Sequence, residues 1–183
     1  DVPEQLDAYR SVVPAHVPVV PLPFPFFPDL RPLPRERDID VFFTGTDTPH
    51  RWGLLNQVRS KVGVYQASYL PEFIRNPLAS RCKVALSLKQ GPDWPYSSPL
   101  RYWYHLNRGG LTLGELCPVG CHLNPYVLRV PTDVLPAAVA DLIHSGRWQG
   151  LARDLGEKYM AEYAARPAAE ELLERTFSRG RSQ

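Results

Sequence analysis

The chain has 183 residues, of which 44% are apolar, 11% aromatic and 22% charged. This composition is typical of a globular domain and excludes a disordered, collagenous or coiled-coil chain. The formal net charge of +2 is too small to indicate nucleic acid as a partner. We find no apolar run near the ~20 residues of a membrane span, and the first residues lack the basic-then-apolar pattern of a signal peptide.

Residues 1–37 are expected to form a short helix and a proline-rich connector. Apolar residues recur at helical spacing over residues 1–13. Prolines then follow one another closely from Pro14 to Pro34, and this spacing removes backbone donors and disfavours helix. The segment is therefore expected to be extended or looped.

The connector is also unusually apolar. A solvated linker or an SH3-type ligand is the alternative interpretation of such a proline-rich stretch. Phe24, Phe26 and Phe27 are too apolar for a solvated tether, so we expect them to be at least partly buried, against this domain or against a second lobe.

Residues 38–183 alternate β-rich and helical patterns, which predicts a parallel sheet of five or six strands with helices on both faces. Expected strands are 39–44, 62–66, 84–88, 111–115 and 126–130. Expected helices are 51–60, 71–79 and 100–108. A further helix is expected to begin at residue 132, to be interrupted at Gly146 and Gly150, and to continue over 151–165. A last helix is expected to begin at Pro167.

The first candidate site is the loop GTDTPHR, residues 45–51, between the first expected strand and a helix. Its hydroxyls, backbone N–H groups and Arg51 could hold a phosphate at the positive end of the helix dipole. The sequence matches no glycine-rich phosphate motif. A plain turn with Asp or Thr as helix cap is the alternative.

The second candidate site is YSSPLRYWYHLNRGG, which begins just before another helix. Ser97 and Ser98 can donate hydrogen bonds to a phosphate, and Arg101 can clamp one with two parallel bonds. In the alternative interpretation the serines cap the helix and its aromatic residues pack inward. Gly109 is expected to end the helix in the left-handed conformation.

Both loops follow parallel strands, so we expect them to lie side by side at the carboxyl edge of the sheet. Arg51 and Arg101 would then bring two positive charges into one space. This arrangement costs free energy unless an anion or a carboxylate is present.

Cysteine and histidine residues offer weaker candidates. Three cysteines are too few for a disulfide framework, which favours a reducing compartment, with the cytoplasm expected. Cys117, Cys121 and His122 could suggest zinc, but the spacing is unfamiliar, and we expect no metal. His50, His105 and His122 are candidate bases by residue type alone, and surface or packing histidines are the alternative interpretation.

Taken together, PLPFPFFPDLRPLPRERDIDVFFTGT, SRCKVALSLKQ and SSPLRYWYHLNRGGLTLGE resemble the carboxyl-terminal domain of CgeB-type (spore-maturation-protein) glycosyltransferases. The resemblance covers residues 15–177. It implies the Rossmann-like donor lobe of a two-lobed GT-B enzyme, with a sugar nucleotide as substrate, an unknown acceptor, and no cofactor or metal. The acceptor lobe would lie in an amino-terminal region or a partner chain, and the lack of an initiator methionine fits a fragment.

The resemblance also implies roles for individual residues. Gly45, Thr46 and Arg51 would face the donor phosphates. Ser97, Ser98 and Arg101 would flank the nucleotide, which the backbone of Gly109 and Gly110 would approach closely.

Two carboxylates of the wider family are missing. Tyr104 stands where the helix glutamate that binds ribose would be, and Tyr96 replaces its partner in the E-x7-E pattern. Tyr104 has one hydroxyl and could replace only part of the ribose contact. The alternative is therefore a non-catalytic Rossmann-like binding module that has lost the ribose carboxylate and binds a protein or peptidic partner through its aromatic surface. An unrelated phosphate-binding α/β domain is a third possibility.

Overall fold

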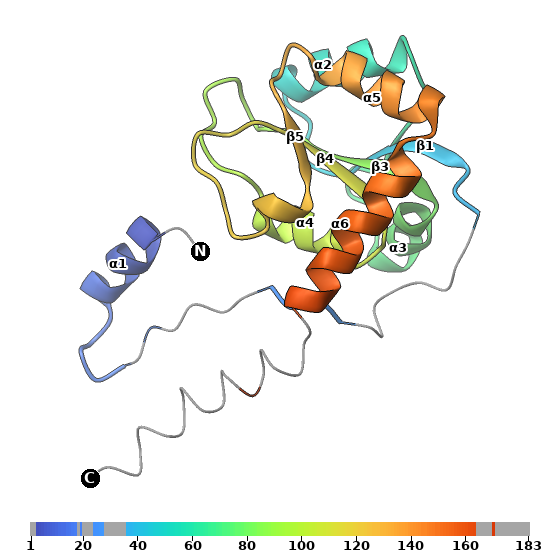
Figure 1. Ribbon diagram of the computed structural model, residues 1–183. Coiled ribbons are helices and arrows are strands. Elements are labelled where there is room, and N and C mark those ends of the chain that lie inside the picture. Colours follow the sequence, from blue (N-terminus) through green and yellow to red (C-terminus); the bar gives the residue numbers. More distant parts are fainter. Residues whose placement is uncertain (1–2, 18, 20–23, 28–35, 164–169, 171–183) are drawn as a thin grey trace.

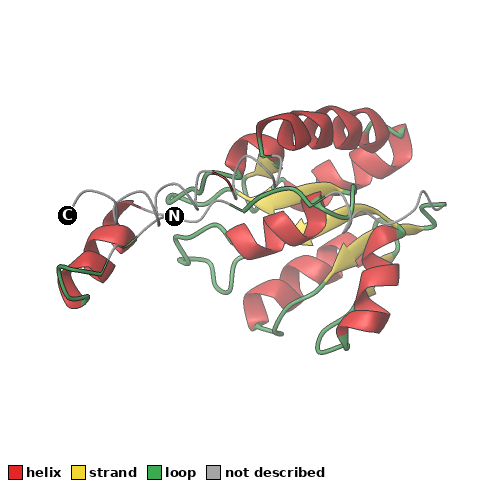
Figure 2. Cartoon of the chain, turned by 90° about the horizontal axis from the view of Figure 1, so that it is seen from below, coloured by secondary structure: helices red, strands yellow, loops and turns green. Residues whose placement is uncertain are grey.

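The structure is a computed structural model that describes residues 3–17, 19, 24–27, 36–163 and 170. In chain order the elements are α1 (Pro3–Val12), β1 (Ile39–Phe43), α2 (Pro49–Arg59), β2 (Val64–Gln66), α3 (Glu72–Ser80), β3 (Cys82–Ser87), α4 (Pro99–Leu106), β4 (Leu111–Glu115), the 3-10 turn η2 (Asn124–Tyr126), β5 (Leu128–Val130), α5 (Leu135–Ser145) and α6 (Trp148–Glu162). The expected fold class is confirmed, because a parallel sheet lies between layers of helices in a Rossmann-like arrangement (Figures 1 and 2).

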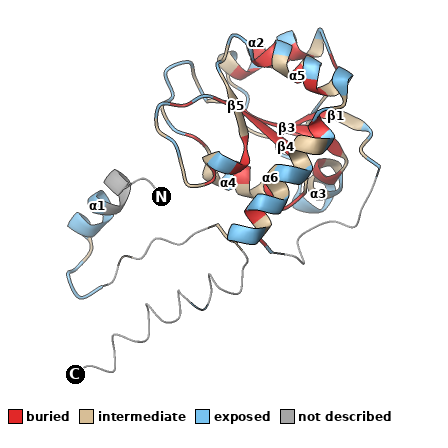
Figure 3. Cartoon of the chain, viewed as in Figure 1, coloured by how far each residue is buried: buried red, intermediate tan, exposed pale blue. Residues whose placement is uncertain are grey.

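The strand order is β2-β1-β3-β4-β5, and every neighbouring pair is parallel. Val41 of β1 pairs with Val64 of β2 on one side and with Val84 of β3 on the other. The three central strands are mostly buried, as their near-continuous apolar runs predict, whereas the edge strands are partly exposed (Figure 3).

Alternating residues of the strands face two helix layers. Val41 and Phe43 belong to the core cluster formed with α2, α5 and the first half of α6. Phe42 and Ala85 point the other way, toward α3 and Tyr104 of α4. Among the described residues, no helix combines the length and apolar character needed to cross a bilayer.

Most expected elements are present, with shifted ends. Gly146 ends α5 with φ 73°, as expected for a left-handed cap. The expected interruption at Gly150 was wrong: this residue lies inside α6, where packing of neighbouring turns outweighs the intrinsic cost of a helical glycine. Tyr126 belongs to the 3-10 turn η2, so β5 begins at Leu128 and not at Tyr126 as expected. The helix expected from Pro167 falls outside the described residues.

The described part of the connector packs against α4 and α6. Phe26 is 7% exposed and joins a core cluster, whereas Phe27 is 39% exposed. Phe24 and Phe27 both contact the ring of Trp103, with centroids 6.0 and 6.3 Å apart. Asn107 Oδ1 accepts a hydrogen bond of 3.0 Å from the Phe27 N–H. The expectation that these phenylalanines are at least partly buried is confirmed for Phe24 and Phe26, whereas Phe27 is exposed although its ring contacts Trp103.

His105 lies in the interior on α4, with 1% of its surface exposed. Among the described residues, neither ring nitrogen has a hydrogen-bond partner. Burial, followed by the positive charges of Arg101, Arg108 and Arg75, lowers the pKa of His105 to about 3. The folded chain therefore holds this imidazole neutral.

We predict that His105 makes the fold sensitive to acid. Only the unfolded chain protonates this histidine as pH falls below its ordinary pKa of about 6.5, so stability is lost between about pH 6.5 and 3. From pH 7 to pH 5 the loss should be about 2 kcal/mol, measured by urea unfolding. His105→Leu should remove this part of the pH dependence, and His144→Leu, at an exposed site on α5, should retain it. Equal pH dependence in the two variants would contradict the assignment.

Candidate functional site

Two loops meet where the chain order of the strands reverses. β1 is followed by β2 on one side, whereas β3, β4 and β5 extend on the other, so the loops after β1 and β3 flank the reversal. Arg51 joins them: its guanidinium donates to the carbonyls of Thr46 (2.8 Å), Leu88 (3.0 Å) and Lys89 (2.9 Å). The expectation that the two loops lie side by side is confirmed.

Arg51 is held mainly by the protein itself. It is 3% exposed and sits in the first turn of α2, where its backbone N–H donates to Thr48 Oγ1 at 3.3 Å. Burial lowers the pKa of Arg51, and the negative charge of Glu115 opposes that effect. Because backbone carbonyls occupy its guanidinium, Arg51 fixes the shape of the site rather than providing the main ligand contact.

The Arg101 guanidinium makes fewer hydrogen bonds within the protein than that of Arg51. Its Nη1 donates to the Leu88 carbonyl at 3.2 Å, and its guanidinium lies 5.8 Å above the ring of Phe43, as does that of Arg51. Burial, followed by the charge of Arg51, lowers the pKa of Arg101 to about 10. In the described part of the chain no carboxylate forms an ion pair with it. An anion would relieve this unfavourable arrangement.

A pocket of about 270 Å³ opens beside Arg101. Its lining combines the loop after β3, the start of α4 and both arginines: Arg51, Ser87, Leu88, Lys89, Gln90, Trp94, Tyr96, Ser97, Ser98, Pro99, Arg101, Tyr102 and Cys117. Ser98 occupies the cap position of α4, but its side chain makes no capping hydrogen bond. Ser97 is buried near Tyr102, whose pKa burial raises to about 12. The Ser98 hydroxyl is therefore the better placed of the two to contact a ligand.

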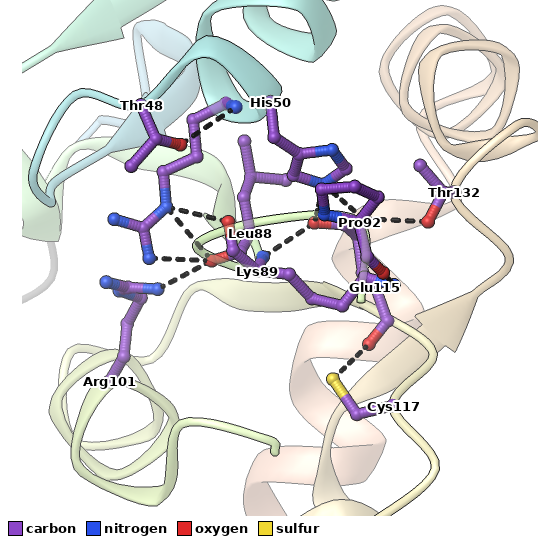
Figure 4. A network of polar contacts seen from close by, with 10 residues as sticks. Thr48, His50, Leu88, Lys89, Pro92, Arg101, Glu115, Cys117 and Thr132 are labelled. Atoms are coloured by element: carbon purple, nitrogen blue, oxygen red, sulfur yellow. Dashed lines mark hydrogen bonds and ion pairs between the residues drawn. The ribbon is translucent and has the colours of Figure 1, made fainter. Parts of the chain in front are cut away.

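Sequence reasoning missed a buried polar cluster beside this pocket. Glu115, at the end of β4, is 0% exposed and accepts hydrogen bonds from His50 Nε2 (2.9 Å), the Lys89 N–H (2.6 Å) and Thr132 Oγ1 (2.7 Å) (Figure 4). These partners come from the first turn of α2 and from the segments that follow β3 and β5. An acidic residue ending an otherwise apolar strand was the only signal for this cluster in the sequence.

The other predicted residues of the first loop lie close to the arginines. A Cβ atom on Gly45 would lie 3.0 Å from Arg101 Nη2 and 3.5 Å from Arg51 Nη1. A side chain at this position would therefore press against the Arg101 guanidinium. Thr46 contributes its carbonyl to Arg51, as described above.

Five predicted residues do not line the pocket: Gly45, Thr46, Tyr104, Gly109 and Gly110. The Tyr104 hydroxyl donates to Asn76 Oδ1 of α3 at 2.8 Å, so its side chain joins two helices. Gly110 packs beside Cys82, the first residue of β3. Helix α4 returns the chain to the start of β4. Gly109 and Gly110 therefore lie at the edge of the sheet where the strands begin, opposite the pocket. Gly109 does adopt the expected left-handed conformation, with φ 70°.

Cys117 and His122 contact different parts of the chain. Cys117 Sγ donates to the Glu115 carbonyl at 3.5 Å, whereas the His122 ring stacks on Phe24 with centroids 5.7 Å apart. Within the described ranges, no group of three or more His, Cys, Asp or Glu residues could hold a metal ion.

No family model matches the chain, and a search of curated proteins returned no match. Fold and site thus define the chain as a Rossmann-like α/β protein with an arginine-lined pocket where the strand order reverses.

Proposed function

We propose that this chain is the donor-nucleotide-binding lobe of a glycosyltransferase, which transfers a sugar from a sugar nucleotide to an acceptor. The observation that carries the proposal is Arg101, whose partly buried guanidinium faces a pocket at the strand-order reversal without a carboxylate partner among the described residues. A diphosphate supplies the negative charge that this arrangement needs.

In this function Arg101, the Ser98 hydroxyl and the positive end of α4 would bind the diphosphate. When the bond between the sugar and the diphosphate breaks, negative charge grows on the leaving phosphate. The same groups would stabilise that charge and so lower the barrier to transfer. The acceptor would be bound by a second lobe, in the same protein or in a partner.

A non-catalytic nucleotide-binding module is the second candidate. It is favoured by the direction of Tyr104, which hydrogen-bonds to α3, and by the lining itself, because no described residue of the pocket carries a carboxylate. The ribose contact of the resembling enzymes therefore has no equivalent in this lining.

Saturation-transfer NMR with UDP-, GDP- and ADP-sugars tests the proposal. We expect at least one of them to bind at millimolar concentration and to compete with its nucleoside diphosphate. Slow release of that diphosphate, detected by phosphorus NMR, would favour the enzyme, and binding without any turnover would favour the non-catalytic module. Lack of binding by all members of the panel would overturn both.

A further inference from the structure

Two exposed aromatic side chains stand on the wall of the pocket. Trp94 and Tyr96 are 42% and 40% exposed, and both line the cavity that contains Arg101. Their ring centroids are 6.0 Å apart with an interplanar angle of 76°. This edge-to-face arrangement leaves apolar ring surface in contact with solvent beside a charged pocket.

The segment that carries these rings is tied down by its backbone. The Trp94 N–H donates to the Gly91 carbonyl at 3.1 Å. After Trp94 in the chain, the Val119 N–H donates to the Pro95 carbonyl at 2.9 Å, and the Ser97 N–H donates to the Val119 carbonyl at 3.1 Å. The aromatic pair is therefore held in position before any ligand arrives, which reduces the entropy lost on binding.

From this arrangement we propose that Trp94 and Tyr96 form the stacking platform for the nucleobase of a nucleoside diphosphate. The inference rests on the proposed function and deepens it, because it assigns the base end of the ligand. With the phosphates on Arg101, the ribose and base extend along the same wall toward the aromatic pair. Every base has a flat π face, so such a platform binds bases with little discrimination among them.

The lining favours a nucleotide over an apolar peptide. A peptide side chain could cover the two rings, but it would leave Arg101 without an anion. Pyrophosphate alone would satisfy Arg101 and leave the rings exposed. A ligand with both a flat ring and a diphosphate matches both features of the pocket.

Titration calorimetry on the whole chain separates these contributions. The probes are UDP, ADP, pyrophosphate and glucose 1-phosphate, and the test variant is Trp94→Ala. We expect the variant to bind UDP and ADP about tenfold or more weakly and pyrophosphate within about twofold of the native chain. The matched control is Trp52→Ala, because Trp52 is 54% exposed on α2 and does not line the pocket. It should change none of these affinities.

Several outcomes would overturn the platform. Nucleotides that bind the native chain no more tightly than pyrophosphate would show that the base makes no contact. If Trp94→Ala weakens only glucose 1-phosphate, the rings hold the sugar. Either result leaves the proposed function standing, provided that a sugar nucleotide binds. If no probe binds the native chain, the proposed function and the platform both fail.

Discussion

Glu115→Ala should lower the free energy of unfolding by about 3 kcal/mol, because each donor left without its acceptor away from water costs about 1–3 kcal/mol. The carboxylate is fully buried and accepts from His50, the Lys89 backbone and Thr132. Its loss would leave these three donors, which are partly buried, without their acceptor. Urea unfolding at neutral pH measures the change.

The matched control for this prediction is Asp141→Ala. Asp141 forms an exposed ion pair with Arg147 on the surface of α5, and such pairs contribute about 0–1 kcal/mol. Glu115→Gln should lie between the two, because an amide keeps one acceptor but turns a donor toward its partners. A free energy of unfolding within about 1 kcal/mol of the native value in Glu115→Ala would contradict the structural role assigned to this carboxylate.

Arg101→Ala should weaken binding of the best sugar nucleotide by about 1.5–3 kcal/mol, the contribution of a hydrogen bond to a charged group, which corresponds to a loss of about 10- to 150-fold. Stability should be unchanged or slightly higher, since the substitution removes a charge that is partly buried beside Arg51. Calorimetric titration and thermal unfolding of the same sample measure both effects.

Arg51→Ala provides the contrasting control. Because Arg51 joins the two loops through backbone carbonyls, its removal should lower stability as well as affinity. Arg101→Lys should recover part of the affinity, since it restores the charge without the planar fork. Unaltered affinity in Arg101→Ala would remove the support for a donor site in this pocket.

The sheet and the meeting of the two loops could be predicted from sequence because both follow from local patterns and simple topology. Apolar runs such as 39–43 and 84–88 indicate buried strands, and parallel strands place their following loops at one edge. The reversal between β1 and β3 then sets the position of Arg51 and Arg101.

Other parts of the site depend on side-chain directions that no spacing rule supplies. Tyr104 follows Arg101 by less than one helical turn, yet it packs against α3 and hydrogen-bonds to Asn76. Gly109 and Gly110 follow α4 closely in sequence but lie at the opposite edge of the sheet. The partners of Glu115 come from α2 and from two separate segments after β3 and β5, which only the folded chain brings together.

Nitrogen-15 HSQC titration with UDP tests the central claim most directly, because it locates the ligand on the fold. The backbone amides of Gly45, Leu88, Ser98 and Arg101 should shift together and saturate with one dissociation constant, as expected if the strand-order reversal holds the diphosphate. The amides of Gly109 and Gly110, at the opposite edge, should stay in place. Shifts centred on that opposite edge, or no shifts at millimolar UDP, would contradict the account.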